Sequence, residues 1–214
     1  MINEENIRNR SELTEKEIPD KNESGKVDSK PIKVSDDLDS KEILVFTSFN
    51  NVYKVKKTAI RDKFEALQKI EFEHGEKPIY LTGEKNYSGF LIVAFENGKI
   101  GKISMSSYQT DYNRKKLKNA FNSESRLIFI ELIEHDIDIV TVSSIKKVVL
   151  FNTAQINSVE SRTTKGVQVM KPKDGSSMIK VKRLEQTKLT EPEYYRKNET
   201  LNVVGYYLKQ GDEV

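Results

Sequence analysis

The sequence contains no cysteine and no tryptophan, and it has only two histidines among its 214 residues. Without cysteine the chain can form no disulfide, bind no zinc through thiolates and use no thiol nucleophile, and such an absence fits a reducing compartment. No apolar run approaches the roughly 18–20 residues that span a bilayer. The first residues also lack the apolar stretch of a secretory signal. The sequence therefore predicts a soluble, cytoplasmic protein.

The short motifs of common catalytic sites are also absent. The sequence has no Walker phosphate loop, no GxGxxG turn and no His-Glu-x-x-His segment. His74 and His135 lack the spacing of metal ligands, and we interpret both as surface or turn residues. Asp136 and Asp138 are paired carboxylates that could bind a metal ion, although at the start of a strand they more often face solvent. We expect the chain on its own to be no enzyme and to hold no cofactor and no metal.

Charge is unevenly distributed along the chain. Residues 1–42 hold 12 acidic and 8 basic residues, whereas residues 43–214 hold 21 acidic and 28 basic ones. An acidic tail on a basic body often accompanies nucleic-acid binding, although a lysine-rich solvated surface gives the same pattern. Residues 1–41 have too few apolar side chains to offset the entropy of ordering. We predict a disordered acidic arm or linker over this segment.

From residue 42 onward, short β-branched and aromatic runs alternate with turn residues, which is typical of β-strands. These runs recur every 48 residues, so that Ile43, Leu91 and Ile139 fall in one column. A period of about 40–50 residues with several strands per unit indicates a propeller-like array. The repeats span residues 42–89, 90–137 and 138–184, followed by a linker and a C-terminal strand over residues 185–214.

Each repeat has room for about four strands. In the third repeat we expect them at Asp138–Ser143, Lys147–Ile156, Gly166–Lys171 and Met178–Leu184. The absence of tryptophan argues against WD40 blades, and the absence of a Gly-Gly doublet argues against kelch blades. The predicted fold is all-β, a propeller-like array of about three four-stranded blades. A polar linker over Thr187–Thr200 and a last strand within Leu201–Leu208 complete it.

The repeats resemble the C-terminal β-pinwheel repeats of bacterial type IIA topoisomerases, which are found in the A subunits of DNA gyrase and topoisomerase IV. The resemblance lies in the segment ILVFTSFNNVYKVKKTAI and in the turn Arg162–Val167, which looks like the Arg-rich turn of that family. The C-terminal Gly211-Asp212 is similar to the turn that closes many of its blades. The resemblance implies a β-pinwheel whose blades share strands and whose basic rim binds and bends double-stranded DNA.

The resemblance also implies partners. The chain would be a non-catalytic accessory domain, and its partners would be the catalytic core of the A subunit, in cis or as a separate chain, and the ATPase subunit. Its place would be the bacterial cytoplasm, at the nucleoid. The Gly-rich box of gyrase is missing because no Gly-Gly occurs, which favours a topoisomerase IV-like or degenerate module. No Arg-Tyr pair occurs either, so no strand-passage tyrosine is carried over.

The candidate DNA contacts are basic residues of strands and inter-strand turns, where they would neutralise phosphates along a curved edge. They are Lys54, Lys56, Lys57 and Arg61 in the first repeat, Arg114, Lys115, Lys116 and Lys118 in the second, and Lys146, Lys147, Arg162 and Lys165 in the third. Arg114 and Arg162 lie 48 residues apart in corresponding turns, which favours DNA contact there. For the first group, a solvated strand face explains the lysines equally well.

Two other hypotheses stay open at this point. A propeller-like array can be a protein-interaction scaffold that holds a peptide or a partner protein; an apolar, weakly charged rim would favour that function. A decayed fragment with weak binding would also fold in this way.

Overall fold

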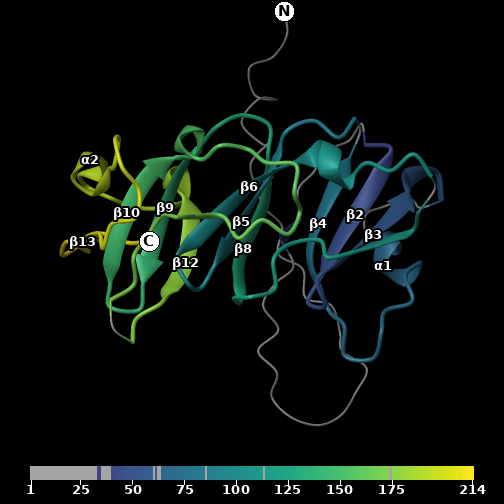
Figure 1. Cartoon of the computed structure of the whole chain (residues 1–214), viewed down its shortest axis with the longest axis horizontal. Coiled ribbons are helices and arrows are strands. Elements are labelled where there is room, and N and C mark those ends of the chain that lie inside the picture. The colour runs from purple at the N-terminus through teal and green to yellow at the C-terminus, as the bar shows by residue number, and fades with distance from the viewer. Residues whose placement is uncertain are drawn as a thin grey trace, which may run out of the picture. The chain divides into compact units, whose positions relative to one another are not determined.

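The computed structural model describes residues 33–34, 40–59, 61, 64–84, 86–112, 114–173 and 175–214. The chain divides into two compact units, with the division after residue 85. Strands, turns and very short helices make up the described residues, so the all-β prediction is confirmed (Figure 1). No helix in these ranges is long and apolar enough to cross a membrane.

The strands repeat with the period that the sequence predicted. The first strands of the repeats are β2 (Glu42–Thr47), β5 (Phe90–Phe95) and β9 (Asp138–Ser143), and the second strands are β3 (Asn51–Lys56), β6 (Lys99–Ser104) and β10 (Lys147–Asn152). A 3-10 turn follows each second strand, at η2 (Lys57–Ala59), η3 (Met105–Tyr108) and η4 (Thr153–Gln155). Ile43, Leu91 and Ile139, which share a sequence column, are all buried. The apolar columns are therefore core positions.

The first unit contains one sheet. Its strand order is β1 (Lys33–Val34), β4 (Pro78–Glu84), β2 and β3, with β1 parallel to β4 and the other pairs antiparallel. Buried side chains of β2, β3 and β4 pack against the short helix α1 (Glu65–Gln68). Most of the predicted disordered arm lies outside the described residues. Within it, however, Lys33–Val34 adds a strand to β4 by parallel pairing with Tyr80 and Leu81.

The second repeat forms a four-stranded sheet in the order β11 (Val167–Gln168), β6, β5 and β8 (Leu127–Ile133). The strand predicted at Gly166–Lys171 is β11, which is shorter than expected. Although β11 belongs in sequence to the third repeat, it pairs with β6 and so completes the sheet of the second repeat. Gly166 has a φ of 72°, and a Cβ there would lie 2.6 Å from the carbonyl of Ile100. Only glycine permits this approach of the crossing strand to β6. β7 (Lys116–Lys118) lies between η3 and β8 in the sequence.

The third sheet has the order β12 (Met178–Arg183), β9, β10 and β13 (Tyr206–Tyr207), as Figure 1 shows. The turn η5 (Leu184–Gln186) and the helix α2 (Pro192–Tyr195) connect β12 to β13. The segment predicted as a polar linker, Thr187–Thr200, contains α2, whose Tyr195 is fully buried against Val140, Val148 and Leu150. The last strand is confined to two residues.

A continuous apolar core joins the second and third sheets within the second unit. Members from the second sheet include Ile92, Phe129 and Ile133, and members from the third include Ile139, Val149, Phe151 and Val181. Val169 and Met170, which follow β11 on the crossing segment, are also buried in it. Neighbouring blades thus complete one another's core, which is why a single blade would not be stable alone.

Candidate nucleic-acid interface

Two basic turns that lie 48 residues apart in the sequence are in contact in the structure. The Nε of Arg162 donates to the carbonyl of Asn119, the residue after β7, at 3.4 Å, and Nδ2 of Asn122 donates to the carbonyl of Thr163 at 3.1 Å. The ammonium of Lys165 lies 2.8 Å from the Glu124 carboxylate. The segment around β7 and the turn before β11 therefore form one surface.

We call this surface the basic patch and define it by its exposed cations. They are Arg114, Lys115, Lys118 and Lys165. Lys116 is half-buried. The Lys165–Glu124 pair is well exposed on both sides, so water and salt screen it and a phosphate can compete for the lysine.

Arg162 differs from these cations because its guanidinium is half-buried and already hydrogen-bonded to backbone carbonyls. Its Nη1 donates to the carbonyl of Ser107 at 2.8 Å, and the group lies 5.9 Å from the ring centre of Tyr108. Burial raises the pKa of Tyr108, although the charge of Arg162 acts in the opposite direction. The Tyr108 hydroxyl donates to the carbonyl of Ala120 at 2.6 Å. Arg162 and Tyr108 together hold η3 and the segment after β7 in position.

Sequence reasoning did not single out Tyr112, which is 76% exposed beside the basic patch. Its carbonyl accepts hydrogen bonds from the backbone N–H of Arg114 at 2.7 Å and from the Thr110 hydroxyl at 2.8 Å. These bonds fix the turn that presents Arg114. No pattern in the sequence around Tyr112 distinguishes this exposed tyrosine from a buried one.

Lys146 and Lys147 lie at a different place, since Lys146 ends the turn between β9 and β10 and Lys147 begins β10. Lys146 is exposed and has a φ of 58°, and its carbonyl accepts a hydrogen bond from the backbone N–H of Leu208 at 3.0 Å. The ammonium of Lys147 lies 3.5 Å from the ring centre of Tyr207 on β13. Both lysines therefore belong to the β13 edge of the third sheet.

The candidates of the first repeat lie in the first unit. Lys54 and Lys56 are on β3, and Lys57 begins η2. Lys56 and Arg61 are exposed, whereas Lys54 and Lys57 are half-buried. Arg61 lines a shallow hollow of about 390 Å³ together with Thr58, Ala59, Glu65 and Lys69. Its backbone N–H donates to the Glu65 carboxylate at 2.8 Å.

The paired carboxylates Asp136 and Asp138 are occupied by cations. Asp136 accepts hydrogen bonds from the ammonium of Lys102 and the hydroxyl of Thr153, both at 2.6 Å. Burial acts to raise the pKa of Asp136, but these two bonds outweigh it and the pKa lies below its usual value. In the described ranges no group of three or more acidic or histidine side chains could hold a metal ion. His74 and His135 are both exposed.

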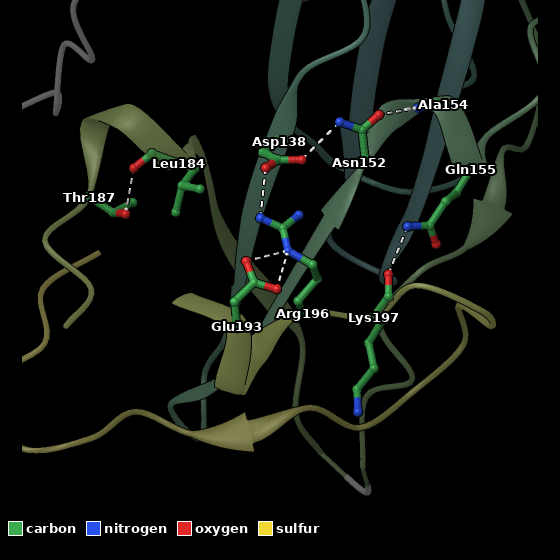
Figure 2. Close-up of polar contacts among 9 residues, drawn as sticks. All are labelled: Asp138, Asn152, Ala154, Gln155, Leu184, Thr187, Glu193, Arg196 and Lys197. Atoms are coloured by element: carbon green, nitrogen blue, oxygen red, sulfur yellow. Dashed lines mark hydrogen bonds and ion pairs between the residues drawn. The ribbon is translucent and has the colours of Figure 1, made fainter. Parts of the chain in front are cut away.

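Asp138 anchors the third blade through Arg196, as Figure 2 shows. The guanidinium of Arg196 lies between the carboxylates of Asp138 and Glu193, with hydrogen bonds of 2.8 Å to each. Asn152 donates to Asp138 from the other side at 2.8 Å. The bond from Arg196 lowers the pKa of Asp138, with burial opposing it. The segment after α2 is thereby fixed to β9 and β10.

The Gly211-Asp212 turn closes the third blade. Asp212 is buried and accepts hydrogen bonds from the backbone N–H and the hydroxyl of Thr190, both at 2.8 Å. The hydroxyl of Tyr195 donates to its other carboxylate oxygen at 2.7 Å. This carboxylate therefore joins the C-terminal turn to α2.

No protein-family model matches the chain, and a comparison with curated proteins finds no significant match. Solved structures do match it. The C-terminal domain of DNA topoisomerase IV matches with a TM-score of 0.62 and 16% identity, over 81% of this chain and 61% of that one. The C-terminal domain of DNA gyrase A matches with a TM-score of 0.55 and 15% identity, over 98% and 75%. The E. coli ParC C-terminal domain gives 0.60 and 9%, over 81% and 78%.

At these identities the likeness establishes the fold. The chain has the fold of the C-terminal domains of gyrase A and topoisomerase IV, as its repeats predicted. It spans 61% of the length of the topoisomerase IV domain that it matches.

Proposed function

We propose that the chain binds and bends double-stranded DNA without reading its sequence, as an accessory, non-catalytic C-terminal domain of a type IIA DNA topoisomerase A subunit. One observation carries the proposal. The segment around β7 and the turn before β11, which the repeat places in corresponding positions, lie in contact and present Arg114, Lys115, Lys118 and Lys165 to solvent. The fold shared with the gyrase A and topoisomerase IV domains supports the same function.

The chemistry of such binding is electrostatic. Each phosphate that a lysine or arginine neutralises releases counterions, and the binding constant falls with salt at a log–log slope of about −0.9 per phosphate. Binding at the patch needs no hydrogen bond to a base edge, so the affinity tolerates any sequence. The bend costs elastic energy, which further phosphate contacts offset.

The partners follow from this function. The catalytic core of the A subunit, in cis or as a separate chain, and an ATPase subunit would perform strand cleavage and passage. The domain would work in the bacterial cytoplasm at the nucleoid. The missing Gly-Gly doublet favours a topoisomerase IV-like contribution over gyrase-type wrapping.

The test is duplex binding by fluorescence anisotropy across a salt series with a 20-base-pair DNA. The variant Arg114→Ala/Lys118→Ala/Lys165→Ala should bind at least about ten-fold more weakly and show a shallower salt slope by about 2–3. The matched control, Lys69→Ala/Lys171→Ala/Lys173→Ala, removes three exposed charges elsewhere and should lose much less. Equal losses in both variants would mean that net charge alone drives binding, and no loss in either would reject the patch.

A further inference from the structure

A second cluster of exposed side chains lies at the β13 edge of the third sheet. Tyr194 on α2 and Tyr206 and Tyr207 on β13 are 41%, 39% and 63% exposed. Tyr195 is buried, and its hydroxyl is fixed by Asp212, which turns the neighbouring Tyr194 outward. Tyr206 and Tyr207 are successive residues of an edge strand, so their side chains leave on opposite faces of the sheet.

The exposed rings are held in place. Tyr206 packs on Tyr194 with ring centres 4.8 Å apart, and Tyr194 packs on the buried Tyr195 at 4.9 Å. Tyr207 pairs with Lys147 across the strands. The rings of Tyr194, Tyr206 and Tyr207 therefore have fixed positions although much of their surface is exposed to water. Ring surface that stays exposed contributes little to the stability of the fold, which points to a role in binding.

The ammonium group of a lysine also lies close to each exposed ring. Lys147 lies 3.5 Å from the ring centre of Tyr207, Lys197 lies 4.2 Å from that of Tyr206, and Lys209 lies 4.3 Å from that of Tyr194. We call the three tyrosines and these lysines the tyrosine–lysine cluster.

The backbone of Lys197 is anchored on both sides. Its N–H donates to the carbonyl of Leu150 at 2.8 Å. Its carbonyl accepts from Nε2 of Gln155 at 2.7 Å, as Figure 2 shows. Its ammonium also donates to the Tyr206 hydroxyl at 2.8 Å.

The cluster keeps a positive charge. Glu191 lies 2.7 Å from the ammonium of Lys209, and Glu193 is occupied by Arg196. In the described part of the chain, no ion pair within 4.0 Å involves Lys147 or Lys197. A ligand with planar faces and regularly spaced negative charges satisfies both the rings and the lysines.

We propose that the tyrosine–lysine cluster binds single-stranded nucleic acid that crosses the β13 edge, with unpaired bases stacking on Tyr194 and Tyr206 on one face and on Tyr207 on the other, and with phosphates contacting Lys147 and Lys197. Base–aromatic stacking in a positively charged groove is the usual means of holding single strands without sequence preference. A duplex keeps its base faces inside the stack and cannot use the rings. The cluster therefore goes beyond the proposed duplex binding and does not depend on it.

The test uses the full chain and three fluorescent probes, namely a 15-nucleotide oligo(dT), an abasic strand of the same length, and a 15-base-pair duplex. Wild type should bind oligo(dT) at least about ten-fold more tightly than the abasic strand, because only the former can stack. Tyr206→Leu/Tyr207→Leu should remove this difference, and Tyr206→Phe/Tyr207→Phe should keep it. Phe49→Leu changes an exposed aromatic ring of the first unit, which belongs to neither the basic patch nor the cluster, and should bind oligo(dT) as wild type does.

Three results would overturn the proposal. They are equal binding of the abasic strand, unchanged oligo(dT) binding in the leucine variant, and displacement of oligo(dT) by an oligo-glutamate peptide at the same concentration as by unlabelled oligo(dT). The duplex probe separates the two sites, because the leucine variant should bind it as wild type does. If the basic patch does not bind duplex DNA, the comparison of oligo(dT) with the abasic strand still tests the tyrosine–lysine cluster.

Discussion

Nη1 of Arg162 donates a hydrogen bond to the backbone carbonyl of Ser107 at 2.8 Å, which ties the turn before β11 to the 3-10 turn after β6. Arg162, which the sequence offered as a candidate DNA contact, thus organises the surface on which the cations of the basic patch lie. Its bonds to backbone carbonyls indicate that a change there alters stability.

Replacing this arginine should destabilise the second unit. Arg162→Ala leaves the carbonyls of Ser107 and Asn119 without their donor, which costs about 1–2 kcal/mol. Urea unfolding followed by circular dichroism measures this change. The control Lys165→Ala breaks an exposed ion pair and should stay within about 0.5 kcal/mol of wild type. Equal stability of the two variants would show that Arg162 does not hold the turns together.

Gly166 offers a second stability test, because its backbone lies against β6. Gly166→Ala places a Cβ 2.6 Å from the Ile100 carbonyl at a φ of 72°, and we expect a loss of more than about 2 kcal/mol in the free energy of unfolding. Gly175 has a φ of 68°, but a Cβ added there would meet no atom within 4 Å, so Gly175→Ala should cost only about 1 kcal/mol. Similar losses at both positions would contradict the close approach of β11.

Stability of the first unit should depend on pH through Glu76. Burial acts to raise the pKa of this carboxyl, but hydrogen bonds from Thr47, Asn51 and Tyr53 outweigh it and lower the pKa to about 2. A depressed pKa means that this stabilisation is fully present above the ordinary value of 4.5 and is lost as the pH falls toward about 2.

Glu76→Gln is the variant that tests this dependence. At pH 7 it should lower the free energy of unfolding by about 2 kcal/mol, and between pH 4.5 and 2 its stability should change less than that of wild type. Urea titrations at several pH values provide the comparison. Parallel pH profiles for both proteins would exclude Glu76 as the source.

Tyr195 and Tyr194 are adjacent and allow a matched comparison. Burial and the hydrogen bond to Asp212 raise the pKa of Tyr195 to about 12. Tyr195→Phe removes the hydroxyl that donates to Asp212 and accepts from the Lys209 N–H, and it should cost about 1–2 kcal/mol. Tyr194→Phe changes an exposed ring and should be nearly neutral in thermal unfolding. A neutral Tyr195→Phe would show that the C-terminal turn does not depend on this bond.

The sequence predicted the repeat because its signal is local. A strand, a turn and a second strand recur at the same spacing, and the columns that contain Ile43 and Val52 are apolar in all three repeats and buried in the structure. The candidate patch was predicted in the same way, since Arg114 and Arg162 stand one period apart.

The exchange of strands was less accessible to sequence reasoning. β11 and β13 are two residues long, and each is stabilised by a neighbouring strand that is far away in sequence. The sequence of Thr187–Thr200 looks like that of a linker because a single tyrosine, Tyr195, is its buried hydrophobic side chain. Arg162 donates hydrogen bonds to backbone carbonyls, and no pattern of side chains in the sequence predicts such bonds.

The most direct test of the central claim measures the shape of bound DNA. A duplex of about 30 base pairs with a fluorescent donor and acceptor at its ends is titrated with the full chain at low salt, and energy transfer between the ends is recorded. We expect transfer to rise with wild type and to stay low with Arg114→Ala/Lys118→Ala/Lys165→Ala, because fewer phosphate contacts offset the bending energy. Saturating binding with no rise in energy transfer would contradict the account.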